Sequence, residues 1–454
     1  MPIFDTMLVN IELNTTFNLQ IIRSKPMNFL KKLTPFTLPF LLIACGDDDA
    51  DTSGLQAPAA YEFTSLTDPS APSSVDYKVA TTQLTLIKEL EYLIGSDELQ
   101  AYGQANDRDA VIVLLNRIYE GGTDTSFSNN LASVNLYDDT STPTTIKGIN
   151  LGDGTLNFAA DSLAENTNLK STVSSEIDIQ IQDWFFNIAT LAADFNNDTR
   201  FTNNGFNFRA LVIGNLSVTM PFNQVSNTYL SASSLGADNT RNDSSSSYTQ
   251  LEHNWDLSFG YFGSSKLANT LSLDKVISIN SNETNDVNSL DNFVFDVAAA
   301  TAQRDFDSTL RESNFSKAII EGFLIGRTAI SLDESHELYS KQTSLINQYA
   351  SDILYNWEKS LAATLIYHTK NTIVNRYKPT DYDYHWAMMT VYAQAIASYE
   401  DSLLPPETIT LLTNDKLSTI DLNKQTIYLE TLFEAEQTIK TTYGFSNSDV
   451  SSWR

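Results

Sequence analysis

The residues best suited to chemistry lie in Tyr248–Gly263, which reads YTQLEHNWDLSFGYFG. This stretch combines two acids, Glu252 and Asp256, with His253 and several aromatic residues, in a chain that has only four histidines. Carboxylates and a neutral imidazole can hold a divalent metal or haem iron, and they can also bind a polar organic ligand. The stretch is therefore the first candidate for a functional site.

The spacing within this stretch predicts a helix. Residues three and four apart lie on the same helical face, which places four side chains in one stripe: Glu252, Trp255, Asp256 and Phe259. Thr249 and Glu252 have the spacing of a capping box, which predicts the start of the helix. Gly260 is expected to end it.

Two interpretations of this helix follow from its geometry. In the first, His253 and Asp256 point into a helical bundle and hold a metal or a polar ligand. In the second, Trp255, Phe259 and Tyr261 fill a hydrophobic core, and Asp256 orients His253. Helical spacing alone favours the second interpretation, because buried aromatic stripes are common in cores.

The other histidines extend the metal hypothesis. His385 has Asp381 one turn away, as His253 has Asp256, so a metal site formed by His253, Asp256 and His385 is one hypothesis. The metal would be iron or another divalent ion, with haem as the alternative. The Glu-x-x-His ligands of bundle metal sites do not occur, and neither do the HExxH, GxSxG, P-loop or GxGxxG signatures. The sequence therefore favours a binding protein over an enzyme.

Composition limits the possible partners. The 454 residues carry a net charge of −28 and give a pI of about 4.3, so there is no surplus of Lys and Arg for binding nucleic acid. Hydrophobic residues make up 42% of the chain, which is enough for a sizeable core. A single cysteine excludes an internal disulfide framework.

That cysteine follows a segment that resembles a secretion signal. From Met27 the chain has two lysines, then the apolar run Phe36–Ile43, and then Leu42–Cys45, which reads LIAC and looks like a bacterial lipobox. The apolar run is shorter than the roughly 20 residues that span a membrane. We expect residues 1–26 to be a non-native upstream extension and residues 27–45 to be a lipoprotein signal peptide, with lipid on Cys45.

Residues 46–74 are expected to be a disordered tether, because they are rich in Ala, Pro, Ser, Thr and Asp. Acyl chains on Cys45 would attach the protein to a membrane, since each buried CH₂ contributes about 0.8 kcal/mol. Gly46 follows the cysteine, and Asp47–Asp49 resembles an acidic surface-sorting signal. These features predict an outer-membrane lipoprotein on the periplasmic or cell-surface face.

Residues 75–454 are expected to form an all-α body of two packed helical bundles with irregular loop insertions, possibly as lobes 75–265 and 285–445. The range 206–223 fits either a strand or a helix, and 123–168 looks like an irregular insertion. Apolar periodicity predicts helices over 82–94, 107–119, 174–194, 285–301, 315–330, 337–374, 383–399 and 423–442.

Four segments together resemble one family of bacterial lipoproteins, the domain of unknown function 4856. They are the lipobox, the Tyr248–Gly263 stretch, WEKSLAAT at Trp357–Thr364 and HWAMM at His385–Met389. The resemblance extends from about Ser73 to the C-terminus. This family is in turn similar to the imelysin-like proteins, which are exported, consist of two helical bundles and are often linked with iron or haem acquisition.

The resemblance implies a set of ligand-binding candidates. Glu252, His253, Trp255, Asp256 and Tyr261 occupy family-motif positions, and a second cluster contains His385 and Trp386. It also implies an accessory role in iron or haem uptake, beside an outer-membrane receptor. Two alternatives are a hydrolase related to the imelysin peptidases, which the absence of their GxHxxE signature disfavours, and a structural or adhesive surface lipoprotein.

Overall fold

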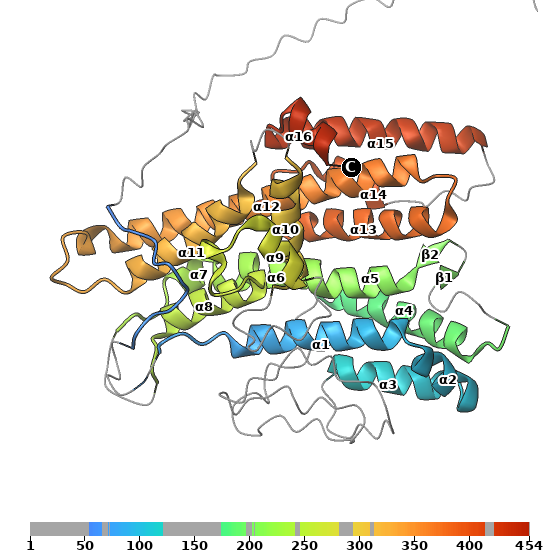
Figure 1. Ribbon diagram of the computed structural model, residues 1–454, viewed down its shortest axis with the longest axis horizontal. Helices are drawn as coiled ribbons and strands as arrows, with labels where there is room; N and C mark the ends of the chain where they lie inside the picture. The colour runs from blue at the N-terminus through green and yellow to red at the C-terminus, as the bar shows by residue number, and fades with distance from the viewer. Residues whose placement is uncertain are drawn as a thin grey trace, which may run out of the picture. The chain divides into compact units, whose positions relative to one another are not determined.

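A computed structural model of the chain describes residues 54–65, 71, 73–120, 174–196, 202–203, 205–240, 246–280, 294–308, 313–413 and 422–453. These residues fold almost entirely into helices (Figure 1), so the predicted all-α class is confirmed. The strands in this part of the chain are two residues long. β1 (Thr202–Asn203) pairs antiparallel with β2 (Phe206–Asn207), with Thr202 opposite Asn207. The signal peptide, Cys45 and the predicted 123–168 insertion lie outside the described residues.

The first half of the body contains short and medium helices. They are α1 (Lys78–Gly95), α2 (Asp97–Ala105), α3 (Arg108–Glu120), α4 (Ser175–Ala193), α5 (Phe208–Gly214), α6 (Met220–Gln224), α7 (Ala232–Leu235), α8 (Gln250–Phe262) and α9 (Leu273–Asn280). Two π-helical turns, η3 (Asn215–Thr219) and η4 (Val225–Tyr229), join α5, α6 and α7, and η5 (Ala268–Thr270) is a 3₁₀ turn. The ambiguous range 206–223 is thus mainly helical.

The second half contains the longer helices. They are α10 (Asp296–Asp307), α11 (Phe315–Ile330), the 3₁₀ turn η7 (Tyr339–Lys341), α12 (Gln342–Val374), α13 (Pro379–Ala397), α14 (Pro406–Thr413), α15 (Leu422–Tyr443) and α16 (Asn447–Ser452). Pro379 is the first residue of α13, where its fixed φ and missing N–H fit a helix start. The predicted range 337–374 is therefore a 3₁₀ turn followed by one unbroken helix.

Helix α12 is the centre of the packing. It runs between α11 and α13 and also contacts α10 and α15 (Figure 1). Helices from the first half pack onto this group, because α8 contacts α11 and α5 contacts α13. Residues 51–454 form one compact unit, and a continuous apolar core runs through both halves.

Helix α8 has the predicted start and a different end. The capping box is present, with the Thr249 hydroxyl accepting from the Glu252 N–H and the Glu252 carboxylate accepting from the Thr249 N–H at 2.8 Å. The helix continues past Gly260 and ends at Gly263, whose φ of +76° is typical of a left-handed cap. Gly260 serves packing instead, because a Cβ there would lie 2.7 Å from the Cβ of Tyr77.

The described residues before α1, 54–65 and 73–77, pack against the body, so this part of the range 46–74 differs from the predicted disordered tether. Leu55 and Tyr61 are buried, and Ser74 is fully buried. The Tyr61 ring stacks on Phe259 with centroids 3.8 Å apart and an interplanar angle of 1°. The polar composition of the segment predicts disorder, because it does not show that a few residues are buried. Their burial depends on contacts with α8, which is remote in sequence.

Candidate functional site

The two acids of the central stretch form a buried ion-pair network. The guanidinium group of Arg327, on α11, donates from Nε to Asp256 Oδ1 at 2.9 Å and from Nη1 to Glu252 Oε1 at 3.0 Å. All three side chains are at most 2% exposed. Arg327 also donates to the hydroxyls of Ser331 and Ser74, each at 2.8 Å. The five donors of the guanidinium group are thus largely used within the protein.

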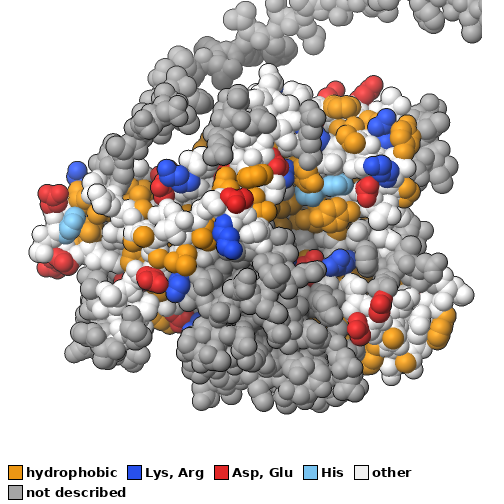
Figure 2. All heavy atoms as spheres, viewed as in Figure 1, with side chains coloured by type: hydrophobic (Ala, Val, Ile, Leu, Met, Phe, Trp, Pro, Cys, Tyr) orange, Lys and Arg blue, Asp and Glu red, His pale blue; other side chains and the backbone are white. Residues whose placement is uncertain are grey.

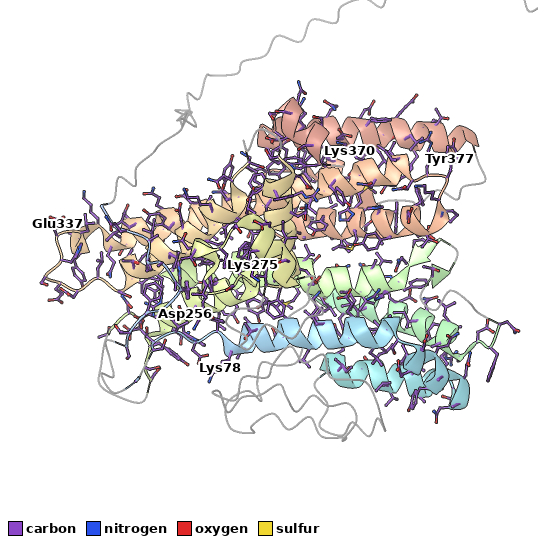
Figure 3. The ribbon with its side chains drawn as sticks, viewed as in Figure 1. Lys78, Asp256, Lys275, Glu337, Lys370 and Tyr377 are labelled. Carbon is purple, nitrogen blue, oxygen red and sulfur yellow. The ribbon has the colours of Figure 1, made fainter. Side chains whose placement is uncertain are left out.

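Asp256 has further partners from the N-terminal segment. The Tyr61 hydroxyl donates to Oδ1 at 2.8 Å, and the N–H of Asp76 donates to Oδ2 at 3.2 Å. Burial raises the pKa of Asp256 to about 6, against the lowering effects of Arg327 and of these hydrogen bonds. Figure 3 labels Asp256, which lies inside the body rather than on a solvent-facing surface. These contacts leave Asp256 little capacity for a ligand.

The aromatic members of the motif are also core residues. Trp255 is fully buried and donates from Nε1 to the carbonyl oxygen of Phe323 at 2.9 Å. Tyr261 is 1% exposed and donates to Gln83 Oε1 at 2.5 Å. Gly326 makes room for the indole, since a Cβ there would lie 2.0 Å from a Trp255 ring atom. These side chains agree with the core interpretation of the helix.

His253 does not pair with Asp256. Its Nδ1 lies 3.1 Å from the carbonyl oxygen of Asp76, and its ring stacks on Tyr248 with centroids 4.5 Å apart. Burial lowers the pKa of this half-buried imidazole, so it is neutral near pH 7. The expectation that Asp256 orients His253 is therefore wrong, because Asp256 faces Arg327 instead.

The second predicted cluster lies on different helices. His385, on α13, contacts His368 of α12 with their Nδ1 atoms 3.1 Å apart, and Trp386 donates from Nε1 to the Tyr428 hydroxyl at 3.0 Å. His253 and His385 share no hydrogen-bond partner. Within the described residues, no three His, Cys, Asp or Glu side chains are grouped to hold a metal ion. The structure thus does not assemble the predicted ligand set of His253, Asp256 and His385.

A cavity of about 330 Å³ adjoins the His368–His385 contact. Its walls come from the end of α1, from α5 and η3, from α10, and from α12 and α13. On the face shown in Figure 2, histidine, aromatic or aliphatic, and basic side chains gather over this region. The polar and aromatic lining residues are Glu91, Asn207, Arg209, Ser217, Asp296, Gln303, Arg304, Thr364, Tyr367, His368, Tyr384 and Tyr392.

Arg304 is one of two arginines that line this cavity, and two of its nitrogens are unsatisfied. The residue is 5% exposed, and Nη2 pairs with Asp307 at 3.0 Å. Its guanidinium carbon lies 4.2 Å from the centroid of the Tyr367 ring. The buried Nε and Nη1 atoms have no hydrogen-bond partner among the residues that the structure describes. Buried donors are almost always paired, so these two mark a place for an acceptor.

His368 supplies a neutral imidazole beside Arg304. It is 5% exposed, and burial, together with the neighbouring His385 and Arg304, holds its pKa well below the ordinary value. Its Nδ1 is engaged by His385, which leaves Nε2 as the ring nitrogen for a ligand. The ring stacks on Tyr392 with centroids 5.5 Å apart. The imidazole can therefore donate or accept one hydrogen bond through Nε2 with a molecule in the cavity.

The opposite end of the cavity carries balanced charges. Lys88 pairs with Asp296 and, at 3.2 Å, with Glu91, while Arg209 lies 3.3 Å from Glu91. Asp296 and Arg304 are eight residues apart on α10, which corresponds to about 12 Å along the helix axis. The acids and bases at this end already pair with one another. An anion in the cavity would therefore have its most favourable electrostatic interaction at Arg304.

Arg304 and the cavity were missed in the sequence. The predicted helix over 285–301 ends before Arg304, whereas α10 extends to Asp307. Asp296, Ala300 and Arg304 follow at intervals of four, so they share one helical face that lines the cavity. The spacing of Asp296 and Arg304 on one helical face could have indicated a polar site. It becomes visible only when the helix is extended beyond residue 301 to include Arg304.

A family model described as "Domain of unknown function (DUF4856)" matches residues 58–355, about two thirds of the 454 residues. The chain belongs to this family. The match includes the Arg327 network and Arg304, while the cavity residues of α12 and α13 follow it in the chain. No curated protein and no solved structure matches the chain. The described helices include none with the length and apolar character needed to cross a bilayer.

Proposed function

We propose that this DUF4856 protein is a lipid-anchored, extracytoplasmic binding protein whose cavity at Arg304 holds a small organic anion. The observation that carries the proposal is the pair of buried Arg304 donors, Nε and Nη1, without partners in the described protein. An arginine offers planar donors suited to a carboxylate, and hydrogen bonds between charged groups are about twice as strong as neutral ones.

The surroundings of Arg304 also favour an anion over a metal cation. Burial lowers the pKa of its guanidinium group, but the group stays charged near neutral pH, because arginine ordinarily titrates far above 7. A free cation would be repelled by this charge, whereas a carboxylate would satisfy it. If the protein takes part in iron or haem uptake, this cavity would therefore bind the metal as part of a carboxylate-bearing molecule. A haem propionate or a carboxylate chelate would supply such a group.

The proposal is for binding rather than hydrolysis. A histidine base needs a nucleophile or water on one ring nitrogen and an orienting group on the other. Nδ1 of His368 contacts the imidazole of His385, and no carboxylate orients it within the described part of the chain. Neither the central stretch nor the cavity therefore supplies the parts of a hydrolase that the imelysin-related alternative requires.

Replacing Arg304 with methionine is expected to weaken anion binding by about tenfold to a hundredfold, the value of a hydrogen bond to a charged group. Isothermal titration of the full chain with acetate, benzoate, citrate, glucuronate and haemin would measure the effect. Arg304→Lys keeps the positive charge but offers a point charge instead of a planar fork, so an intermediate affinity is expected.

Arg376→Met is a matched control, because this guanidinium group also lies over a tyrosine ring, 4.5 Å from the Tyr377 centroid, but outside the cavity. It should leave every affinity unchanged. Circular dichroism would check that each variant is folded. The proposal would be rejected if no carboxylate bound the wild-type chain, or if folded Arg304→Met bound as tightly as the wild type.

The membrane anchor has a separate test at Cys45. Cells expressing Cys45→Ala are expected to lose the protein from the membrane fraction, because the thiol that would carry the lipid is gone. Gly46→Ala should remain in the membrane fraction. Immunoblots of the two fractions would measure this, and membrane retention of Cys45→Ala would remove the lipid-anchor part of the proposal.

A further inference from the structure

We infer that the ligand of this cavity is a hydroxylated carboxylate the size of one sugar ring, a class that includes the hexuronates; this rests on the proposed anion site at Arg304. Three features of the cavity support it independently of the charge: unsatisfied tyrosine hydroxyls, an aromatic wall, and a small volume. Helices α12 and α13 contribute the residues of the first two features.

The tyrosine hydroxyls are the first feature. Tyr367, Tyr384 and Tyr392 line the cavity, and none of their hydroxyls has a hydrogen-bond partner among the described residues. Tyr392 is 4% exposed, and burial raises the pKa of its hydroxyl, with smaller contributions from Tyr384 and Asp296 that raise it and from Arg304 that lowers it. A buried hydroxyl can donate one bond and accept two, so it matches the hydroxyl group of a ligand.

The aromatic wall is the second feature. His368 and Tyr392 lie nearly parallel, with an interplanar angle of 22°, and Tyr367 meets His368 edge-on at 4.9 Å. Tyr384 also lines the cavity, and it is 43% exposed. Such side chains offer apolar ring faces and polar tips. A sugar ring has the same division, with C–H groups on its faces and hydroxyls around its rim.

Volume sets the size of the ligand. Small-molecule sites commonly measure about 300–1,000 Å³, and this cavity, at about 330 Å³, is near the lower limit. A single six-membered ring with a carboxylate fits that scale. The carboxylate would accept from one of the two unpaired Arg304 nitrogens, because Nε and Nη1 point to different edges of the guanidinium plane. The ring hydroxyls would meet Nε2 of His368 and the tyrosine hydroxyls.

Two ligands of similar ring size separate the hydroxyl groups from the carboxylate. The full wild-type chain is expected to bind glucuronate at least about tenfold more tightly than cyclohexanecarboxylate, because the latter offers no hydrogen-bond partner to the tyrosine hydroxyls that line the cavity. Isothermal titration at one pH and salt concentration would give both dissociation constants.

Tyr392→Phe removes one hydroxyl and keeps the ring. It is expected to weaken glucuronate binding at least about fivefold and to change cyclohexanecarboxylate binding less than about twofold. Tyr377→Phe is the control, since this tyrosine is 70% exposed and does not line the cavity. Both affinities should be unchanged in it.

Each result has a distinct meaning. Equal or tighter binding of cyclohexanecarboxylate, with both ligands weakened by Arg304→Met, would overturn the hydroxylated class and leave the anion site standing. Failure of both carboxylates to bind the wild-type chain would overturn the anion site as well. A glucuronate preference that Tyr392→Phe does not reduce would also contradict the inference, because the buried hydroxyl would then play no part in recognition.

Discussion

The variant Arg327→Met is expected to lower the free energy of unfolding by about 3–5 kcal/mol, the usual cost of removing one partner of a buried ion pair. Glu252 and Asp256 would lose their cationic partner in an interior where both are at most 2% exposed. Removing Arg327 also takes away its lowering effect on the pKa of Asp256, so part of the cost is the uptake of a proton by that carboxylate. The hydrogen bonds to Ser74 and Ser331 would be lost too. Urea unfolding followed by far-UV circular dichroism would measure the change.

Lys317→Met is the matched surface control. Lys317 also lies on α11, but its side chain is 63% exposed and its ion pair with Glu321 spans 3.8 Å. A change within about 0.5 kcal/mol is expected. Combining Arg327→Met with Glu252→Gln and Asp256→Asn should recover part of the loss, because no uncompensated charge remains. A loss below about 1 kcal/mol for Arg327→Met alone would show that the network is not the anchor of α8.

Local signals predicted the helices well. The capping box of Thr249 and Glu252 places the start of α8 correctly, and the apolar spacing over 315–330 gives α11 its bounds. The end of α8 was predicted wrongly, because a glycine inside a helix and a glycine at its cap look alike in one sequence. Gly260 is needed for the close approach of α1, a contact that local sequence does not reveal.

The candidate site was harder to predict because its partners are remote in sequence. The helical stripe correctly marked Glu252, Trp255 and Asp256 as sharing one side of α8. Asp256, however, pairs with Arg327, 71 residues away, and with Tyr61, 195 residues away. An acid on an apolar face indicates burial with a partner, but not whether that partner is a metal, a ligand or an arginine.

The cavity shows the same limit in another form. His368 has no acid three or four residues away, so helical spacing did not mark it as a candidate ligand as it did His253 and His385. Its role depends on α10 bringing Arg304 against α12, and on α13 bringing Tyr392 alongside. Only tertiary packing shows that Arg304 has unsatisfied donors, which is the observation on which the proposed function depends.

Trp255 and Gly326 form a packed pair whose loss is expected to have the second large effect. Trp255→Ala should cost about 3–5 kcal/mol, because it empties a fully buried site and removes the bond to the Phe323 carbonyl. Gly326→Ala should cost about 1–3 kcal/mol, since its Cβ would lie 2.0 Å from the indole. Alanine's better helix propensity, worth about 1 kcal/mol, offsets part of that clash.

The double variant tests whether the two effects share one cause. Trp255→Ala with Gly326→Ala should cost less than the sum of the single changes, by about 1–2 kcal/mol, because the new methyl group enters the space left by the indole. Gly236→Ala, whose nearest contacts would be 3.6 Å away, should instead add its small effect to that of Trp255→Ala. Chemical unfolding of the three single variants, the two double variants and the wild type would give these values. Additive costs for the Gly326 pair would mean that α11 shifts away from α8 to admit the methyl group, and that the close approach of the two helices at Gly326 is not what holds Trp255 in place.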